Sequence, residues 1–139
     1  MITGVANLAI KVADLDGAVE FYRRAGARVT DPEAWRNGRR ADVALGALAI
    51  TLFTHAVYED DVAGLPAEGF LHVALFTDDL DREMEGHSVV WGPQVVSGPT
   101  FGTRRIVFVD NGLRQHRRDG TRRKGFAERL LQQIADLGL

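Results

Sequence analysis

Two stretches of the chain alternate between hydrophobic and polar residues, and they resemble each other in sequence. Residues 5–12 follow the two-residue period of a half-buried strand, with aliphatic side chains on one face. Residues 70–77 repeat this strand 65 residues further along, so His72 falls at the place of Asn7. An internal repeat determines the architecture, and this one predicts two copies of a unit about 55–65 residues long.

The first copy has the pattern of a strand, a helix and three further strands. Asp14 or Asp16 can cap the helix by accepting a hydrogen bond from a free backbone N–H, and Gly26 is a suitable terminator. A turn at Gly46 bends the last two strands into a hairpin. The predicted strands are residues 5–12, 27–30, 39–45 and 48–54, with a loop over residues 31–38.

The second copy follows residues 55–69, which contain four acidic residues and which we interpret as a surface linker. Its short helix should end at Gly86, and Gly92-Pro93 favours an edge position or a bulge for the strand around it. Asn111-Gly112 is a tight-hairpin signal, and an apolar stripe near the C-terminus predicts an additional helix. The predicted elements are strands 70–77, 89–96, 103–109 and 113–118, and a helix over about 124–137 with Phe126, Leu130, Ile134 and Leu137 in its stripe.

Composition excludes several classes of function. The 139 residues suffice for one domain with a core, and a formal net charge of −2 gives no reason to expect a nucleic-acid partner. Cysteine is absent, which excludes disulfides, thiolate–zinc sites and a cysteine nucleophile. Without an apolar run of about 18 residues or a signal-peptide pattern, we expect a cytoplasmic protein with no membrane partner. We interpret the basic tract from Arg114 to Lys124 as a solvated connector, with phosphate or nucleic-acid binding as the alternative.

The openings of the two copies, NLAIKVADLDGAVEFY and HVALFTDDL, resemble the vicinal oxygen chelate superfamily. That group includes glyoxalase I, extradiol dioxygenases, fosfomycin-resistance enzymes and bleomycin-resistance proteins. The resemblance covers about residues 4–118 and implies an α+β fold in which two tandem βαβββ modules form a cupped mixed sheet. It implies module 1 over about 4–54 and module 2 over about 70–118, within a single glyoxalase/bleomycin-resistance-like domain over residues 1–139.

The resemblance also implies where a metal ion would bind. Metal-dependent members take their ligands from the first and last strands of each copy, which here places Asn7, Thr51, His72 and His116 at the four positions. Imidazole is a good ligand for transition metals, but the carboxylate usual in the family is missing and a catalytic site needs about three good ligands. We therefore expect no metal and no cofactor, while a site that uses His72 and His116 stays open.

Alternation of side chains predicts which residues face the cup. The first and last strands would contribute Asn7, Ala9, Lys11, Ala49, Thr51, Phe53, His72, Ala74 and Phe76, and their neighbours Arg40, Asp42, Arg105, Val107, Val109, Arg114 and His116. Asp42 is either a general base with a pKa raised by burial or, more simply, the partner of Arg40, Arg105 or Lys11. The predicted ligand-binding residues are Asn7, Thr51, Phe53, His72, Phe76, Trp91, Arg105 and His116.

A cup with aromatic lining but poor metal positions predicts a metal-free small-molecule-binding protein. Its ligand would be aromatic or polycyclic, such as an antibiotic, held by stacking and a few polar contacts. One alternative is a metal-dependent lyase, isomerase or dioxygenase that uses His72 and His116. A second alternative is a metal-free enzyme with His72 or Asp42 as acid or base, and a third is a regulatory partner protein. Family members commonly pair their sheets, so we also predict a homodimer.

Overall fold

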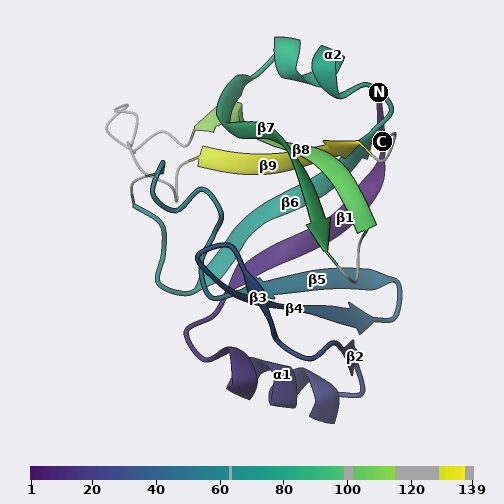
Figure 1. Ribbon diagram of the computed structural model, residues 1–139, viewed down its shortest axis with the longest axis vertical. Coiled ribbons are helices and arrows are strands. Elements are labelled where there is room, and N and C mark those ends of the chain that lie inside the picture. The colour runs from purple at the N-terminus through teal and green to yellow at the C-terminus, as the bar shows by residue number, and fades with distance from the viewer. Residues whose placement is uncertain (63, 99–101, 115–128, 137–139) are drawn as a thin grey trace.

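Nine strands form one curved sheet in the computed structural model, which describes residues 1–62, 64–98, 102–114 and 129–136. The strands are β1 (Ile2–Lys11), β2 (Arg28–Val29), β3 (Glu33–Trp35), β4 (Gly38–Leu45), β5 (Leu48–Phe53), β6 (Gly69–Thr77), β7 (Ser88–Gly98), β8 (Gly102–Arg114) and β9 (Arg129–Asp136). Helices α1 (Leu15–Arg24) and α2 (Leu80–Glu85) follow the first strand of each half (Figure 1). This arrangement confirms the predicted α+β fold of two βαβββ modules.

The strand order shows that the two modules are arranged alike. It runs β2-β4-β5-β1-β6-β9-β8-β7, with β3 paired to β4, so it repeats outwards from the central pair β1 and β6. These two strands are antiparallel, while β5 joins β1 and β9 joins β6 in parallel. β7 lies at the end of the sheet, and its pairing with β8 shifts register on both sides of Trp91, as Gly92-Pro93 indicated.

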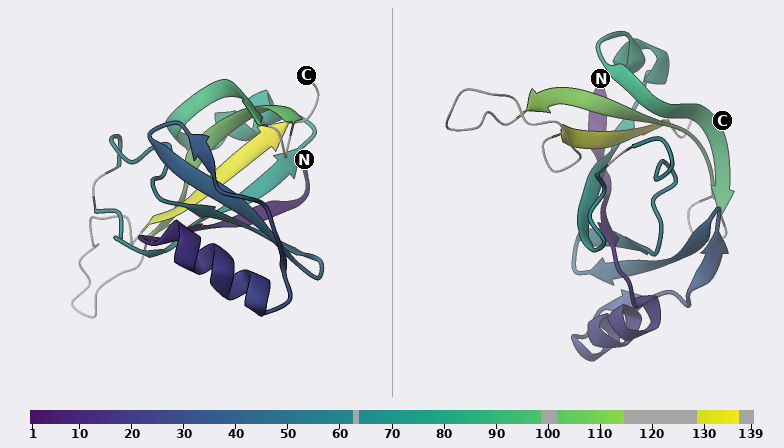
Figure 2. Two further views of the ribbon diagram at one scale, coloured as in Figure 1. Left: turned by 60° about the horizontal axis from the view of Figure 1, so that its bottom comes forward. Right: turned by 90° about the vertical axis from the view of Figure 1, so that its left-hand side faces the viewer.

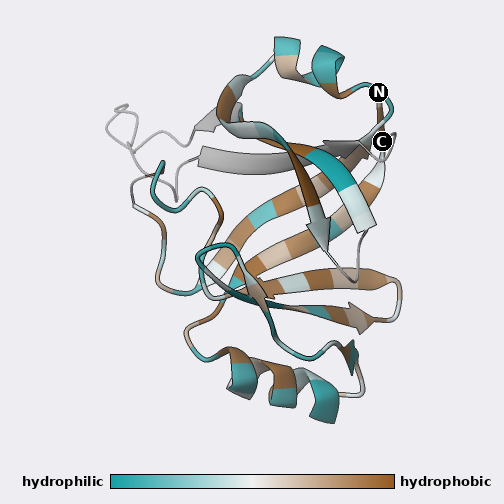
Figure 3. Cartoon of the chain, in the orientation of Figure 1, coloured by the Kyte–Doolittle hydropathy of each residue, from teal (hydrophilic) through white to brown (hydrophobic). Residues whose placement is uncertain are grey.

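The predicted register of the central strands is confirmed. Hydrophobic and polar residues alternate along β1 and β6 (Figure 3), and Asn7 and His72 both line the concave side of the sheet. Ile10 and Val12 lie on the convex side, where they pack against the residues under α1. A one-residue slip would reverse these faces, so the alternation in the sequence was sufficient to assign them.

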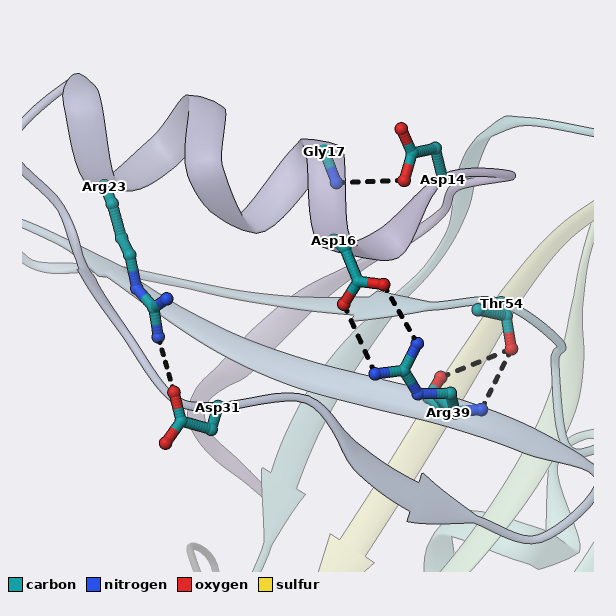
Figure 4. A network of polar contacts seen from close by, with 7 residues as sticks. All are labelled: Asp14, Asp16, Gly17, Arg23, Asp31, Arg39 and Thr54. Atoms are coloured by element: carbon teal, nitrogen blue, oxygen red, sulfur yellow. Dashed lines mark hydrogen bonds and ion pairs between the residues drawn. The ribbon is translucent and has the colours of Figure 1, made fainter.

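Helix α1 covers the convex face of module 1. The Asp14 carboxylate caps the helix by accepting a hydrogen bond of 2.9 Å from the backbone N–H three residues further on. Leu15 and Val19 are buried against β4 and β5, and the Asp16 carboxylate pairs with the Arg39 guanidinium of β4 (Figure 4). Cap, apolar stripe and ion pair therefore fix the helix on the sheet.

The last strand of module 2 differs from the prediction. Residues 129–136 form β9, between β6 and β8, where we expected part of a helix over 124–137. Periodicity alone does not separate a short apolar helix from a strand, and only a strand can satisfy the backbone groups of both neighbours. Asn111 and Gly112 form no hairpin turn, because β8 continues to Arg114 with a register shift against β9. Residues 115–118 of the predicted strand 113–118 lie outside the described part of the chain.

A one-residue difference between the modules overturns a second prediction. Asp42 lies opposite Thr51 in module 1, and Phe108 takes the corresponding place in module 2. The offset between β4 and β8 is thus 66 residues rather than 65. We expected Arg105, Val107 and Val109 on the cup face, and this placement is wrong. Val107 and Val109 pack under α2 with Leu80, and the Arg105 guanidinium pairs with the exposed Asp81 carboxylate.

The segment between the modules is partly internal, in contrast to the predicted surface linker. Figure 2 shows it inside the concave side of the sheet. Ala56, Tyr58 and Val62 are buried in the core cluster that fills this side. Asp60, Asp61 and Glu68 of this segment are exposed, whereas Glu59 is mostly buried and its carboxylate pairs with the Lys11 ammonium. Within the described residues, no helix is long and apolar enough to cross a membrane.

Candidate functional site

A cavity of about 330 Å³ lies on the concave side of the sheet, between the two modules. Strands β1, β4 and β5 supply one wall, while β6, β7 and β8 supply the other. The lining combines apolar, aromatic, acidic and basic side chains. It includes Asn7, Trp35, Arg40, Asp42, Thr51, Phe53, His72, Arg104, Ile106 and Phe108.

Module 1 contributes a chain of polar side chains. The Asn7 amide donates a hydrogen bond to the Thr51 hydroxyl at 3.0 Å, and that hydroxyl donates to the Asp42 carboxylate at 3.0 Å. The Arg40 guanidinium donates to the same Asp42 oxygen at 2.5 Å. Asp42 therefore has the ion-pair role that the sequence favoured, with Arg40 as its partner. Its backbone N–H is also anchored, by the Thr30 hydroxyl at 2.8 Å.

Arg40 is almost completely buried, because its side chain is only 6% exposed. Besides Asp42, its guanidinium lies 3.6 Å from the Glu33 carboxylate. The same group lies over the Trp35 ring at 5.3 Å and over the Phe53 ring at 5.8 Å. Stacking and ion pairing together hold the arginine in one position on the cavity wall.

Module 2 contributes an aromatic cluster around His72. The Tyr58 hydroxyl and His72 Nδ1 are hydrogen-bonded at 2.9 Å, and both side chains are buried. The Phe108 ring lies 4.7 Å from the ring of Tyr58 and 4.9 Å from that of His72, in edge-to-face contacts. Burial, and secondly the charge of Glu59, raise the pKa of the Tyr58 hydroxyl, so it stays protonated at neutral pH.

Arg104 brings a second guanidinium to the cavity. It lies over the Phe76 ring at 5.2 Å. Burial and the nearby charge of Arg40 lower its pKa, whereas the negative charge of Asp42 acts in the opposite direction. Arg104, Arg40 and Asp42 all line the same cavity.

The structure brings together only part of the predicted site. Asn7, Thr51, Phe53 and His72 line the cavity, whereas Phe76 and Trp91 pack against the core cluster beside it. Arg105 lies outside the cavity, on the convex side, as described above. His116 lies outside the described residues.

Trp35, Arg104 and Phe108 line the cavity, but they were neither in the predicted ligand-binding set nor among the residues predicted to face the cup. Arg104 and Phe108 would have followed from an offset of 66 residues, which the sequence alone does not distinguish from 65. Trp35 lies in the segment that we expected to be a loop, and it joins the wall because β3 pairs with β4. No local sequence signal separates such a short strand from a loop.

The side chains at the four family positions do not fit a catalytic transition metal. Since Ala9 pairs with Thr51 and Ala74 with Gln133, the fourth position belongs to Gln133 rather than His116. The side chains at the other three positions are an amide, a hydroxyl and an imidazole, with no carboxylate among them. Among the described residues, no group of three or more histidine or acidic side chains could hold a metal ion.

The comparison with solved structures identifies the fold. No protein-family model matches the sequence, and no curated protein matches it significantly. The methylmalonyl-CoA epimerase of Streptomyces coelicolor in complex with 2-nitronate-propionyl-CoA is similar over 100% of both chains, with 24% identity and a TM-score of 0.64. Glyoxalase I of Zea mays is similar over 99% of this chain and 45% of its own, with 15% identity and a TM-score of 0.63.

A hypothetical protein from Bacillus halodurans is similar over 97% of this chain and 94% of its own, with 15% identity and a TM-score of 0.61. The epimerase and glyoxalase I are vicinal oxygen chelate enzymes, so this chain has the vicinal oxygen chelate fold that its two strand–helix openings indicated. The epimerase is a neighbour that binds a small-molecule CoA ester.

Proposed function

We propose that the cup binds a small planar ligand by ring stacking and a few polar contacts, without a metal ion. The observation that carries this proposal is the union, in one cavity, of the aromatic side chains Trp35, Phe53 and Phe108 with the cluster around Asp42. Apolar walls with a few placed polar groups are typical of ligand pockets, and about 330 Å³ lies near the lower end of their size range of about 300–1,000 Å³. An antibiotic with a compact ring system is one candidate of this type.

The two tryptophans of the chain offer a direct test. Trp35 lines the cavity, whereas Trp91 packs outside it against Phe108. A library of planar compounds, titrated against the protein, should include members that quench the intrinsic fluorescence. The Trp91→Phe protein should retain the quenching, and the Trp35→Phe protein should lose most of it. Quenching that depends on Trp91 and not on Trp35 would place the ligand elsewhere and overturn the proposal.

A substitution at His72 distinguishes a protein that only binds its ligand from one that catalyses a reaction. If the imidazole only contacts the ligand, His72→Gln should weaken binding by about 1 kcal/mol, the usual net value of one hydrogen bond. His87, which is exposed beyond the end of α2, provides the matched control, and His87→Gln should leave the affinity unchanged. Elemental analysis of the wild-type and His72→Gln proteins, purified without chelator, should find no stoichiometric metal. Unchanged affinity in His72→Gln would show that the histidine is structural.

The second candidate function is a metal-free acid–base enzyme. The observation in its favour is that solved structures of this fold, including one that aligns end to end, are enzymes. The cavity also contains a carboxylate, Asp42, and an imidazole, His72. Incubation with methylmalonyl-CoA in D₂O, followed by mass spectrometry, tests proton exchange directly. An exchange rate that falls by about 10²–10⁴ in His72→Gln or Asp42→Asn would favour catalysis over binding alone.

The predicted homodimer remains a proposal, since the structure contains one chain. Light scattering at micromolar concentration tests it, and the mass of a single chain would contradict it.

A further inference from the structure

The turn between β3 and β4 carries an arginine that contacts both modules. The Arg36 guanidinium lies 5.8 Å from the centre of the Trp35 ring and 5.8 Å from that of the Trp91 ring. Trp35 ends β3, which pairs with β4 near one end of the sheet, whereas Trp91 belongs to β7 at the other end. The right-hand view of Figure 2 shows the sheet curving so that β7 reaches down towards β4. Arg36 therefore bridges two parts of the sheet that are far apart in the strand order.

The bridge connects the two walls of the cavity. Trp35 lines the cavity from module 1. The Trp91 ring packs at 5.7 Å on the ring of Phe108, which lines the cavity from module 2. Arg36 itself is exposed and lies outside the lining. The arginine therefore links a ring of each wall on the solvent side of the cavity.

The backbone of Arg36 indicates that this position requires the side chain. Its φ is +53°, and among the described residues it is the one non-glycine residue with a positive φ. Arg36 and Asn37 form a two-residue connection between Trp35 and Gly38, which are paired across the two strands. Glycine adopts a positive φ at the first position of such a turn without strain, whereas an arginine there is disfavoured. The contacts of the long cationic side chain with the two rings give a physical reason for an arginine at this place.

The strength of these contacts decides whether the bridge is a permanent tie or a closure that opens. One exposed cation–π contact favours the closed arrangement by about 2–5-fold at room temperature. Arg36 and Trp35 are neighbours in one turn and move together, so opening breaks only the contact with Trp91. A preference of this size keeps the bridge closed most of the time and still lets it open often.

We propose that Arg36 is a clasp that controls how fast a ligand enters and leaves the cup. The proposal rests on the proposed function above and adds to it the way in which access to the site is regulated. When the guanidinium leaves the Trp91 ring, the turn between β3 and β4 separates from β7 and the ligand passes between the two walls. Because Arg36 does not line the cavity, it changes the rates of binding without changing the affinity.

Stopped-flow fluorescence tests the clasp. 1-Naphthamide, a neutral planar compound, is the first probe, and the strongest quencher of the library replaces it if it does not bind. Arg36→Asn removes the guanidinium and keeps the turn, because asparagine tolerates a positive φ. Its association and dissociation rate constants should both rise by about 2–5-fold, while the dissociation constant changes by less than about 2-fold. Arg36→Lys keeps a cation and should bind at rates close to those of the wild type.

Two further variants separate the clasp from a general effect of losing an arginine. Arg28→Asn is the matched control, since Arg28 is an exposed arginine on β2 of the same module, and it should leave both rate constants unchanged. Trp91→Leu removes the far ring and leaves Trp35 as the one tryptophan of the chain. In that background Arg36→Asn should have no additional effect on the rates, because the two changes break the same contact.

Two results with a bound probe would overturn the proposal. Unchanged rate constants in Arg36→Asn would show that the arginine does not limit access. A rise in the dissociation rate constant alone would show that Arg36 contacts the probe and is not a clasp. In both cases the equilibrium quenching of Trp35 would remain, so the stacking function proposed above would still stand.

A measurement without a bound ligand covers the opposite case. If no planar compound binds, the proposed function has failed, and the clasp is measured with acrylamide, a small neutral quencher of tryptophan fluorescence. The bimolecular quenching constant should be about 2-fold higher in Arg36→Asn than in the wild type, because the bridge is open for more of the time. Arg28→Asn should keep the wild-type value. Equal constants in Arg36→Asn and the wild type would overturn the clasp.

Discussion

Each module forms one half of the sheet with the same arrangement of strands, but the side chains on the two concave faces differ: module 1 presents polar groups and module 2 presents aromatic rings. Asp42 of β4 and Phe108 of β8 occupy equivalent places, opposite Thr51 and Gln133 on the neighbouring strands. In module 1 the place belongs to a carboxylate that joins a chain of hydrogen bonds. In module 2 it belongs to a ring that packs on Tyr58, His72 and Trp91. The two modules thus share their backbone pairing, while the side chains at equivalent positions differ: Asp42 forms hydrogen bonds and Phe108 packs against other rings.

The convex faces differ as well, in size rather than in chemistry. Among the residues whose side chains the structure describes, the ten-residue helix α1 belongs to a cluster of six buried side chains and the six-residue helix α2 to a cluster of three. We therefore expect the truncation of a buried side chain in the larger cluster to cost more free energy of unfolding.

The largest expected effect tests this difference between the convex faces. Leu52 is fully buried under α1 and Leu80 is 1% exposed at α2, so truncation of either side chain leaves a cavity. We expect Leu52→Ala to lower the free energy of unfolding by about 3–5 kcal/mol and Leu80→Ala by about 2–3 kcal/mol. Urea denaturation measures both, with Leu48→Ala at a 43% exposed position as the control. A larger loss for Leu80→Ala would reverse the comparison.

The polar wall of module 1 should also contribute to stability. Asp42→Asn removes the charge that binds Arg40 and Thr51, which we expect to cost about 1.5–2 kcal/mol, at the lower end for charged hydrogen bonds because Asp42 is 29% exposed. Asp31 forms an ion pair with Arg23 at 2.8 Å (Figure 4), but its side chain is 94% exposed. Asp31→Asn should therefore have no measurable effect in the same urea experiment, and equal losses for the two variants would contradict the role assigned to Asp42.

The aromatic cluster around His72, which includes Tyr58 from the segment between the modules, should make the free energy of unfolding depend on pH above about pH 10. The pKa of Tyr58 is raised in the folded protein, chiefly by burial, so its protonated form is favoured by folding. This contribution is complete below about pH 10, the unfolded pKa, and decreases above it by about 1.4 kcal/mol per pH unit. At neutral pH Tyr58→Phe should cost about 1–2 kcal/mol, because it removes the hydrogen bond to His72.

The difference between the wild type and Tyr58→Phe should then shrink as the pH rises from about 9 to 11. Urea midpoints at each pH measure it, and comparison of the two proteins cancels the titration of every other group. A difference that stays constant with pH would show that Tyr58 ionises normally.

The smallest expected effects compare the two helix caps. The Asp14 carboxylate caps α1 at 2.9 Å and the Asp79 carboxylate caps α2 at 3.1 Å. Replacement of an N-cap by alanine costs about 1 kcal/mol, and we expect this value for Asp14→Ala. Asp79→Ala should cost about 0.5 kcal/mol, because the shorter helix buries less. Asp14→Ser, which keeps a capping oxygen, should restore most of the loss in thermal unfolding.

Features that depend on neighbouring residues in the sequence could be predicted. Alternation in residues 5–12 and 70–77 assigned the faces of β1 and β6, since each strand carries its own period. Asp14, Gly26 and Gly86 marked the helix ends, where local backbone groups need a cap or a left-handed residue.

Features that depend on distant partners could not be predicted. Residues 129–136 form a strand because they pair with the free edges of β6 and β8, and the sequence of the segment itself does not indicate these partners. Arg104 and Arg105 are adjacent and alike, so a single residue of offset decided which of them faces the cup. The burial of Tyr58 depends on a cup that the linker itself helps to fill.

The position of β9 has a consequence for the order in which the protein can fold during its synthesis. Module 1 has all its strands once residue 53 has been made, because β5 follows β4 after a two-residue turn. Module 2 must wait for residues 129–136, and until then the facing edges of β6 and β8 have no strand between them. Unpaired edges readily pair with other chains. The growing chain is therefore most exposed to aggregation after β8 has been made and before β9 arrives, and a chaperone that acts on it would act in this interval.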